Sequence, residues 1–471
     1  MPWIIQNNMT LIIVAIMLLG YLLIATESIT NVNKAAVAMF AGTVGWVLYI
    51  CYGTDFVTSM HSSEYFVFLN GQEPTSSNVK QFIAQNVFLG YVGKASEIVL
   101  FLLGTMTIVE ILNNNGCFDF ISQLMRTRSS QKLLWTLAVV TFVISANLDN
   151  LTTTVMMLTI MHSIVPNRRQ RLSYGSAVLL AANCGGALTV IGDPTGLVLW
   201  NMGAVTATNF SLSLIVPCLL AWLVPTYFIG RTLPDQVETE WIVMPYRGDD
   251  TRLNVWQRLL MLFVGIGGLW FIPTFHNITK LSPFLGALCV LSVLWVVNEV
   301  FNRKLMNTEQ MIQRRVPRVL QYGVIQMMLF VMGMMLALGV FVETGAMHKV
   351  TAFVEQNVHN IWILGTLAGI VSSVLDNFAT SLSFISIYPV VDFTRYMNDY
   401  MLQFVQNGDY WKVIAYCSAM GGNVMAIGSV SGLALMKMER MHLGWYLRHV
   451  GWYAMAGGLL GLLALWIVVN V

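Results

Sequence analysis

The chain has 471 residues, of which 56% are hydrophobic and only 10% are charged. Soluble proteins carry about 25% charged residues, so this composition excludes an ordinary soluble protein and indicates a polytopic membrane protein. The formal net charge is +2, which leaves neither a basic face for nucleic acid nor an acidic tail for a basic partner.

The first apolar run covers residues 11–24. No Lys or Arg precedes it and no small-residue cleavage site follows it, so we expect a first spanning helix and not a cleaved signal peptide. The six cysteines are scattered singly, without the spacing of a disulfide framework or a zinc site.

A membrane-spanning helix needs about 20 mostly apolar residues. Two apolar stretches, 133–165 and 360–390, are too long for one span, and each is interrupted by an Asp-Asn pair: Asp149-Asn150 and Asp376-Asn377. The predicted single spans are residues 9–26, 35–51, 95–112, 175–200, 209–230, 255–273, 281–299, 320–341, 411–436 and 445–470.

Basic residues flank both ends of the stretch 133–165, and cytoplasmic loops collect Lys and Arg. Both ends are therefore expected in the cytoplasm. Each arm has about 15 residues, or about 22 Å of helix, which is too short for a core of about 30 Å, so a re-entrant hairpin is predicted. The flanking residues are Arg126, Arg128, Lys132, Arg168, Arg169 and Arg171.

The same reasoning gives a topology for the whole chain, with both termini outside. The outer face receives residues 52–94 and 391–410, which are poor in Lys and Arg, and the hairpin 360–390 enters from that face. The predicted cytoplasmic residues are Lys34, the segment 231–258, Arg303, Lys304, Arg314, Arg315, Arg318, Lys437 and Arg440.

Three motifs recur in the same order along the chain. A Leu-Phe run that ends at Gly104 recurs at Gly333, 229 positions later. Asp149 recurs as Asp376 after 227 positions, and Gly192 as Gly428 after 236. Because the predicted topology gives the two copies opposite orientations, we expect an inverted repeat, the architecture common in secondary transporters.

The expected fold is therefore all-α, with two inverted repeats that each hold a re-entrant hairpin and a discontinuous helix. N-terminal scaffold helices and an outer loop occupy 1–94. The first repeat occupies 95–230, with a hairpin at about 133–165 and a broken helix at about 175–203. Cytoplasmic loops and linking helices occupy 231–319. The second repeat occupies 320–471, with a hairpin at about 360–390 and a broken helix at about 411–436.

Asp149 and Asp376 lie in apolar segments, where a charge costs about 2.5 to 3.5 kcal/mol by insertion scales. A carboxylate there can take a proton or hold a cation, which is the minimum machinery for exchanging one for the other. Nearby amides and hydroxyls add the oxygen ligands that hard cations prefer. An alternative is that each Asp-Asn pair caps a helix. The same pair can cap a helix and bind an ion. The added residues are Asn150, Thr153, Thr154, Asn377, Thr380 and Ser381.

Gly-rich segments at 183–196 and 421–432 are expected to break their helices. Such breaks at matching positions of two halves point to a transport site. Loose helix packing through glycine is the alternative, although it leaves Asp193-Pro194 unexplained. The polar residues there are Asn183, Asp193, Thr195, Asn423, Ser429 and Ser431.

Glu97 and Glu110 share one predicted helix and are 13 residues, or about 20 Å, apart, so they cannot both sit at one site. They are interfacial residues or mark proton entry and exit. The seven histidines form no metal-ligand spacing, and no common catalytic motif occurs, so no enzyme activity and no cofactor are expected.

Several strings resemble the NhaD-type sodium/proton antiporters of the ion transporter superfamily. The match runs from about residue 86 to 450, although Pro194-Thr195-Gly196-Leu197 replaces a Thr-rich run. The strings are Ser-Glu-Ile at 96–98, Met-Thr-Ile-Val-Glu at 106–110, Ser-Ala-Asn-Leu-Asp-Asn-Leu-Thr-Thr-Thr at 145–154, Ile-Gly-Asp at 191–193 and Gly-Gly-Asn at 421–423.

This resemblance implies a homodimer in a bacterial inner membrane, with scaffold helices and a moving transport part. It implies Na+ or Li+ efflux driven by inward proton flow, with Asp149, Asn150, Asp193, Asp376 and Asn377 near the ion. A carboxylate transporter of the same superfamily is the main alternative. The hairpin tips of such transporters resemble the sequence Ser-Asn-Thr, whereas Asp replaces the Ser at both tips here. Two fixed aspartates would repel an anion. A non-transporting scaffold or receptor would leave the paired acids unexplained.

Overall fold

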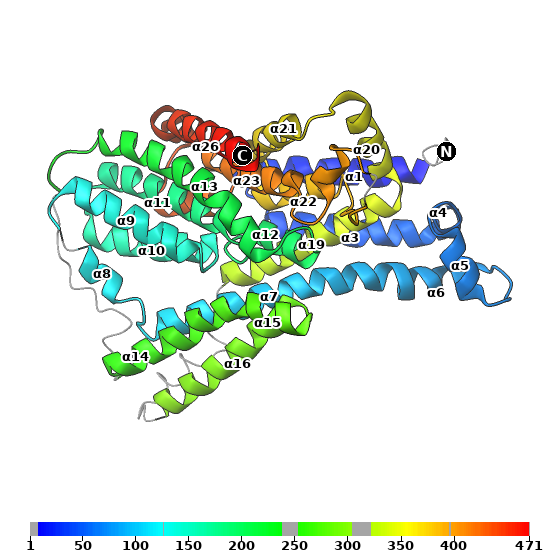
Figure 1. Cartoon of the computed structure of the whole chain (residues 1–471), viewed down its shortest axis with the longest axis horizontal. Coiled ribbons are helices and arrows are strands. Elements are labelled where there is room, and N and C mark those ends of the chain that lie inside the picture. The colour runs from blue at the N-terminus through cyan, green and yellow to red at the C-terminus, as the bar shows by residue number, and fades with distance from the viewer. Residues whose placement is uncertain (1–7, 126, 238–252, 304–321, 395–396, 471) are drawn as a thin grey trace. The chain divides into compact units, whose positions relative to one another are not determined.

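The computed structural model describes residues 8–125, 127–237, 253–303, 322–394 and 397–470, and every regular element within these ranges is a helix (Figure 1). The predicted all-α class is therefore confirmed. Parts of the predicted cytoplasmic segments, namely residues 238–252 and Lys304, Arg314, Arg315 and Arg318, lie outside the described residues.

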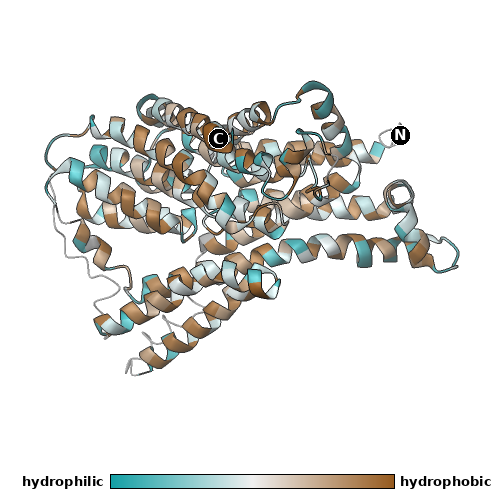
Figure 2. Ribbon diagram, in the orientation of Figure 1, coloured by the Kyte–Doolittle hydropathy of each residue, from teal (hydrophilic) through white to brown (hydrophobic). Residues whose placement is uncertain are grey.

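Nine of the described helices are long and apolar enough to cross a membrane. Apolar residues cover most of their surfaces, and hydrophilic residues gather at loops and helix ends (Figure 2). The sequence predicts ten single spans. The predicted span at residues 175–200 is the one that is not among these nine helices. There the helix begins at Arg168 with a polar first turn and already ends at Leu188.

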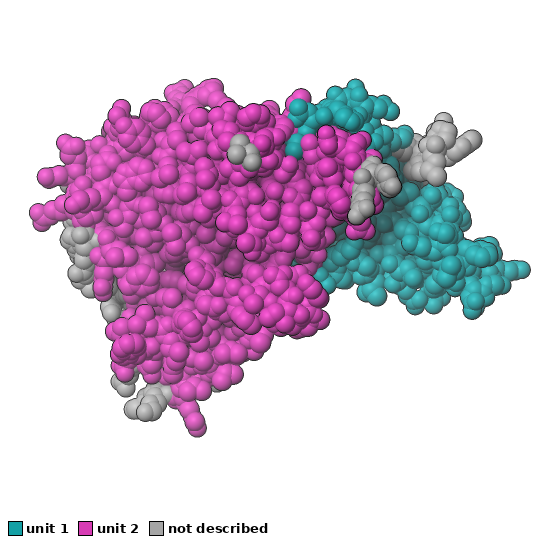
Figure 3. Space-filling model, viewed as in Figure 1, with its two compact units in different colours: residues 1–99, 325–361, 382–389 teal, residues 100–324, 362–381, 390–471 magenta. Residues whose placement is uncertain are grey.

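The chain forms two compact units (Figure 3). Unit 1 comprises residues 1–99, 325–361 and 382–389, and unit 2 comprises residues 100–324, 362–381 and 390–471. Helices α7 (Leu89–Asn114) and α22 (Asn377–Ile385) are divided between the two units, and α19 (Tyr322–Glu343) and α21 (Ile361–Val374) each have one to three end residues in the other unit. The boundaries expected from the repeat do not follow these units and stay a prediction.

Unit 1 is built around an aromatic core in which Tyr49, Phe56 and Phe82 are almost fully buried. Trp46 extends this core, and its Nε1 donates a hydrogen bond to the carbonyl oxygen of Leu336 at 3.0 Å. The other elements of unit 1 are α1 (Asn8–Ala25), α2 (Glu27–Thr30), α3 (Lys34–Cys51), α4 (Gly53–Met60), α5 (Ser62–Leu69), α6 (Ser76–Phe82), the π-helical turn η1 (Ile83–Phe88), α19 (Tyr322–Glu343) and α20 (Ala346–Asn357).

The helix predicted for residues 95–112 begins much earlier, at Ser76, and runs without interruption through α6, η1 and α7. Its 39 residues correspond to about 58 Å, nearly twice the thickness of a membrane core. Val79, Phe82, Ile83 and Val87 follow helical spacing and are buried, while the polar residues between them face outward. Those polar residues lower the mean hydropathy, so the apolar pattern marks only the part of this helix from residue 95 onward, and the predicted span lies inside the longer helix.

Unit 2 holds the remaining elements. They are α8 (Phe120–Leu124), α9 (Ser130–Ser145), α10 (Asn150–Ile164), α11 (Arg168–Leu188), α12 (Pro194–Asn201), α13 (Ala207–Gly230), α14 (Val255–Leu262), η2 (Phe263–Gly267), α15 (Gly268–Thr279), α16 (Pro283–Asn302), α21 (Ile361–Val374), the first part of α22, η3 (Met401–Phe404), α23 (Asp409–Met425), α24 (Val430–Glu439), α25 (Leu443–Tyr446), η4 (Leu447–Gly451) and α26 (Trp452–Asn470).

Helix α11 is the central helix of unit 2 and packs against α9, α10, α13, α23 and α24. Its residues from Tyr174 to Ala187 are all buried. Many of them are Gly, Ala or Ser, and small residues let helices approach closely in a membrane. At Gly185 an added Cβ would collide with the carbonyl oxygen of Phe142 in α9, so only glycine fits there.

At both Asp-Asn pairs one helix ends and the next begins: α9 ends at Ser145 and α10 begins at Asn150, and α21 ends at Val374 and α22 begins at Asn377. Helices α9 and α10 have 16 and 15 residues, close to the arm length expected for the first hairpin. Helices α11 and α12 are separated by residues 189–193, and α23 and α24 by residues 426–429. Helix interruptions therefore lie at all four positions expected from the sequence, while the re-entrant hairpins and the inverted repeat stay predictions.

Candidate ion-binding site

Asp149 and Asp376 occupy the same position in their hairpins, directly before the helix that leads away from the tip. Oδ1 of Asp149 accepts a hydrogen bond from the backbone N–H of Thr152 at 2.9 Å. Oδ1 of Asp376 accepts from the N–H groups of Phe378 and Ala379 at 3.0 and 3.4 Å. Both aspartates therefore cap helices, and the positive ends of α10 and α22 stabilise their charged forms.

The four residues of the two Asp-Asn pairs are buried, and so is Asp193 of the first break. The exposed fraction is 5% for Asp149, 8% for Asn150, 6% for Asp193 and 4% for both Asp376 and Asn377. Asp193 interacts electrostatically with both Asp149 and Asp376, so three carboxylates share one region of unit 2. Keeping all three charged without a compensating cation would be costly.

The breaks in the two discontinuous helices differ in chemistry. Asp193 lies at the N-cap position of α12, directly before Pro194. Ser429 takes the corresponding place in α24, and its Oγ accepts a hydrogen bond from the N–H of Gly432 at 3.1 Å. Ala426, in the second break, has a left-handed backbone with φ of 56°. The first break thus supplies a carboxylate where the second supplies a hydroxyl.

Side-chain hydrogen bonds connect the predicted site residues of the two halves. Asn183 Nδ2 donates to Asn423 Oδ1 at 2.8 Å and lies 3.1 Å from Ser429 Oγ. The hydroxyls of Thr195 and Ser381 are 2.9 Å apart and hydrogen-bonded. One group of hydrogen bonds therefore joins α11 to α23 and the second break, and a separate hydrogen bond joins α12 to α22.

Several buried oxygens in this region accept no hydrogen bond from any described residue. They suit a small hard cation, which prefers oxygen ligands. Among the described residues no group of three or more His, Cys, Asp or Glu side chains could hold a metal ion together. The oxygens are Asp149 Oδ2, Thr153 Oγ1, Asn183 Oδ1, Thr380 Oγ1 and Ser431 Oγ.

Contacts in the first half recur in the second with the offsets of the sequence motifs. Ser145 Oγ donates to the carbonyl oxygen of Ala182 at 2.6 Å, and Ser372 Oγ donates to that of Ser418 at 2.5 Å. The serines are 227 positions apart and the acceptors 236, as for Asp149 and Gly192. Each hairpin is therefore attached to its broken helix by an equivalent hydrogen bond.

Two residues near the site were missed by the sequence reasoning. Thr189 Oγ1 donates to the carbonyl oxygen of Ala146 at 2.6 Å and accepts from the N–H of Gly192 at 3.1 Å, which ties the first hairpin tip to the first break. Tyr446 donates to the carbonyl oxygen of Asn423 at 2.7 Å. The available signal for Thr189 was its position as a polar residue at the start of the first break. Tyr446 has no such local signal.

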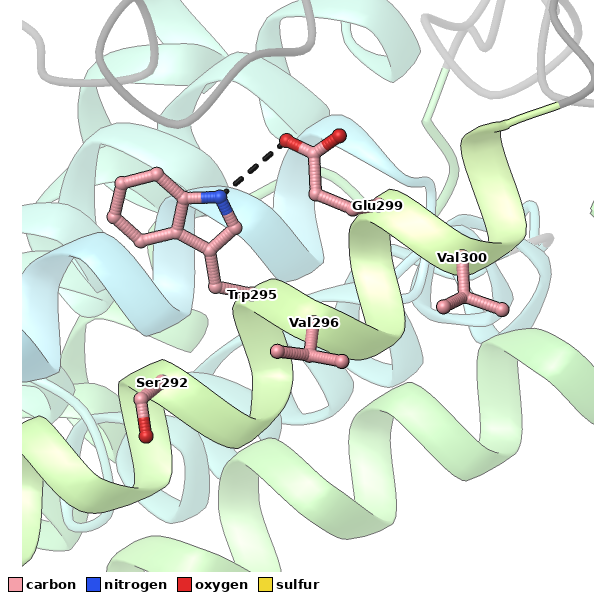
Figure 4. A pocket seen from close by; sticks show the side chains of 5 residues that line it. All are labelled: Ser292, Trp295, Val296, Glu299 and Val300. Carbon is pink, nitrogen blue, oxygen red and sulfur yellow. Dashed lines mark hydrogen bonds between the residues drawn. The ribbon is translucent and has the colours of Figure 1, made fainter.

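Glu97 and Glu110 lie on the same helix, α7, with Glu97 in unit 1 and Glu110 in unit 2. Glu110 is buried, and Asn114 Nδ2 lies 3.4 Å from its Oε1. A shallow groove runs along α16, where Trp295 Nε1 donates to Glu299 Oε1 at 3.3 Å (Figure 4). None of the five residues that line this groove is a predicted site residue.

Comparison with known families gives one match that covers most of the chain. The model of the CitMHS family, described as citrate transporter, matches residues 3–391. This range includes the first break and both Asp-Asn pairs.

Three related proteins are named as antiporters. Sodium/proton antiporter 1 of Arabidopsis thaliana is 32% identical over 79% of this chain, which spans 62% of that protein's length. Sodium/proton antiporter 2 of the same plant is 28% identical over 94% of this chain and 96% of its own. The Na+/H+ antiporter NhaD of Vibrio cholerae is 25% identical over 78% and 76%. The resemblance to NhaD-type antiporters is confirmed.

The fold also has a solved counterpart. The crystal structure of the Alcanivorax borkumensis YdaH transporter covers 98% of both chains with a TM-score of 0.55 and 12% sequence identity. At this identity the match shows a shared fold. The chain is thus a multi-pass membrane protein with a transporter fold.

Proposed function

The chain belongs to the CitMHS family of citrate transporters, and we propose that it exchanges Na+ or Li+ for H+ across a membrane. One observation carries this proposal: Asp149 and Asp376 cap equivalent helices in unit 2, and both interact with the carboxylate of Asp193. The antiporter names of its relatives support the same activity.

The geometry of Asp149 supports competition between a proton and a cation. Its Oδ1 is used by the helix cap, whereas its buried Oδ2 accepts no hydrogen bond from the described residues. Oδ2 therefore binds Na+ or H+ without disturbing the cap. Because a buried charged carboxylate without a bound cation or proton is unfavourable, the site favours a state in which either Na+ or H+ is bound. A Na+ ion that enters then displaces protons.

The remaining predicted residues complete the ion site in this proposal. Asn150, Asn377, Asn183 and Asn423 supply amide oxygens, and Thr153, Thr195, Ser381 and Ser429 supply hydroxyls. Oxygen atoms of this kind replace the water shell of an alkali ion. Glu97 and Glu110 lie on a path for protons along α7.

Alternating access follows from the inverted repeat, in which one part of the protein rocks against another around the site. We propose that the two hairpins and two broken helices move together, since hydrogen bonds join Thr195 to Ser381 and Asn183 to Asn423. The protein acts as a homodimer in a bacterial inner membrane, with both termini outside.

Transport of citrate or another carboxylate is the second candidate, because the family model carries that description. The charges of the site oppose it. Asp149, Asp193 and Asp376 repel an anion unless bound cations or protons neutralise them. A cation is therefore the preferred substrate.

Reconstitution into liposomes with an imposed pH gradient tests the proposal. Na+ or Li+ should drive proton movement in the wild type, and Asp149→Asn and Asp376→Asn should lower the rate at least about tenfold, the effect of about 1.4 kcal/mol. Asp392→Asn, which removes an exposed carboxylate, serves as the matched control. Proton movement that requires citrate and not Na+ would favour the second candidate.

A further inference from the structure

A second cluster of ionisable residues lies in unit 1. Its centre is Glu343, the last residue of α19, whose side chain is 9% exposed. His61 lies between α4 and α5, and its Nε2 is 2.7 Å from Glu343 Oε2. The hydroxyl of Tyr91 donates to Oε1 at 2.9 Å. Both oxygens of a nearly buried carboxylate are therefore engaged.

The other ring nitrogen of His61 also faces a carboxylate. Its Nδ1 is 3.0 Å from Oε2 of Glu64 in α5. A carboxylate accepts hydrogen bonds when charged, and a neutral imidazole has only one N–H. Both contacts are satisfied together only when His61 carries two protons, so the geometry selects the imidazolium.

Among the described ion pairs, the cationic partner of Glu343 is His61. Tyr91 approaches from α7, Tyr49 of α3 interacts electrostatically with Glu343, and the ring of Phe82 packs edge-on against His61. Among the described residues, the titratable groups in direct contact or electrostatic interaction with the pair are thus the two phenols and Glu64, and Lys94 Nζ lies 5.9 Å from the centre of the Tyr91 ring. Neither phenol offers a positive charge.

The protonation state of His61 responds to this environment. Burial by itself lowers the pKa of His61, but the hydrogen bond and charge of Glu343, followed by those of Glu64, outweigh burial and raise the pKa above 6.5. The shift has the direction expected from the contacts.

We propose that His61 and Glu343 form a proton-binding site of their own, distinct from the ion site in unit 2, which ties the α4–α5 segment to α19. The bound proton holds His61 charged and the ion pair closed. Loss of the proton at alkaline pH removes the attraction and leaves Glu343 buried without a cation. The α4–α5 segment then detaches more easily from α19.

The predicted topology places this site at the outer face. Residues 52–94 and the C-terminal end of α19 are both assigned there, and the contact between His61 and Glu343 requires that they share a side. The proton it binds therefore comes from the external medium. The protonation state of this site, and with it the contact between the α4–α5 segment and α19 in unit 1, therefore follows the external pH.

The sign of the pH effect follows from linkage. A histidine with a raised folded-state pKa stabilises the protein fully below its unfolded value of 6.5, and this contribution disappears as pH rises through the folded value. The difference in unfolding temperature between the wild type and His61→Gln should therefore be greatest at about pH 6 and should shrink toward about pH 9.

Thermal unfolding of the purified full-length chain across this pH range provides the test. Glu343→Gln keeps the size of the side chain and an acceptor for Tyr91 but removes the charge, so it should abolish the same pH dependence independently of His61→Gln. Glu64→Gln, at a carboxylate that is 68% exposed, should reduce the dependence only slightly. A difference from the wild type that is constant with pH in both main variants would overturn the proposal.

Transport assays separate this site from the ion site. His61→Gln should retain exchange and shift its pH profile, whereas variants of Asp149 should lose exchange at every pH. Because the unfolding measurement requires no transport, failure of the proposed exchange activity would leave it valid. An unchanged pH profile in His61→Gln together with pH-independent unfolding would count against the site.

Discussion

The hydroxyls of Thr195 and Ser381 form a buried hydrogen bond of 2.9 Å between α12 and α22. Thr195 belongs to the first predicted repeat and Ser381 to the second, 186 positions away. A short polar contact thus joins the broken helix of one half to the hairpin of the other. Thr195 also interacts with the carboxylate of Asp193, which interacts electrostatically with Asp376 and Asp149.

Removal of this hydrogen bond should weaken both stability and ion binding. Thr195→Val keeps the shape of the side chain but removes one of the two hydrogen bonds of the Ser381 hydroxyl, which still donates to the carbonyl oxygen of Phe378, at a cost of about 0.5 to 1.5 kcal/mol. We expect a lower unfolding temperature and a higher half-saturating Na+ concentration in liposomes. Thr195→Ser restores the hydroxyl and should behave like the wild type. Wild-type values for Thr195→Val would show that the contact is dispensable.

The two roles of Asp149 can be separated by substitution. Asparagine is a good helix N-cap, so Asp149→Asn should keep the stability of α10 while removing the charge needed for exchange. Asp149→Ala removes the cap as well and should cost a further amount of about 0.5 to 2 kcal/mol. Unfolding temperature and Na+-driven proton flux, measured side by side, distinguish the roles. Retained exchange in Asp149→Asn would mean that Asp149 is only a cap.

Equivalent glycines should be equally intolerant of substitution. A Cβ at Gly185 would collide with the carbonyl oxygen of Phe142, and a Cβ at Gly421 would collide with that of Gly369. Overpacking of this kind costs about 1 to 3 kcal/mol, so Gly185→Ala and Gly421→Ala should each lower the unfolding temperature. Gly458→Ala is the control, since its Cβ would lie at an ordinary 3.6 Å from Met420. Equal effects at all three positions would contradict the prediction.

A buried ion pair joins the far ends of the site helices. Glu439, at the end of α24, accepts from Arg171 Nε at 2.9 Å and lies 3.0 Å from His162 Nδ1 at the end of α10. Its side chain is 1% exposed, so Glu439→Gln should cost about 3 to 5 kcal/mol by leaving Arg171 without its partner. Glu73→Gln, at an exposed glutamate, should have no measurable effect. Chemical denaturation of both variants provides the comparison.

The sequence predicts the positions of the helix interruptions well because each is marked locally. An Asp-Asn pair inside an apolar run, or a cluster of glycines before Asp193, interrupts a helix wherever it occurs. The same two features also point to the candidate site. Their recurrence at offsets of 227 and 236 positions relates the two halves of the chain to each other.

Long-range contacts have no such local mark. His61 and Glu343 are 282 positions apart, and only the packing of α4, α5 and α19 brings them together. The hydrogen bond from Tyr446 to the carbonyl oxygen of Asn423 also has no recognisable pattern in the local sequence. Polar residues on one face of the helix that begins at Ser76 concealed its start, since hydropathy averages over both faces.

Proton release on Na+ binding tests the central claim most directly. Addition of NaCl or LiCl to the purified chain in weakly buffered solution, followed with a pH indicator, should release protons from the wild type and from Asp392→Asn. Asp149→Asn and Asp376→Asn should release far fewer, and calorimetry should show that both variants are folded. Na+ binding to the wild type without any proton release, or equal release from all variants, would contradict competition for the same carboxylates.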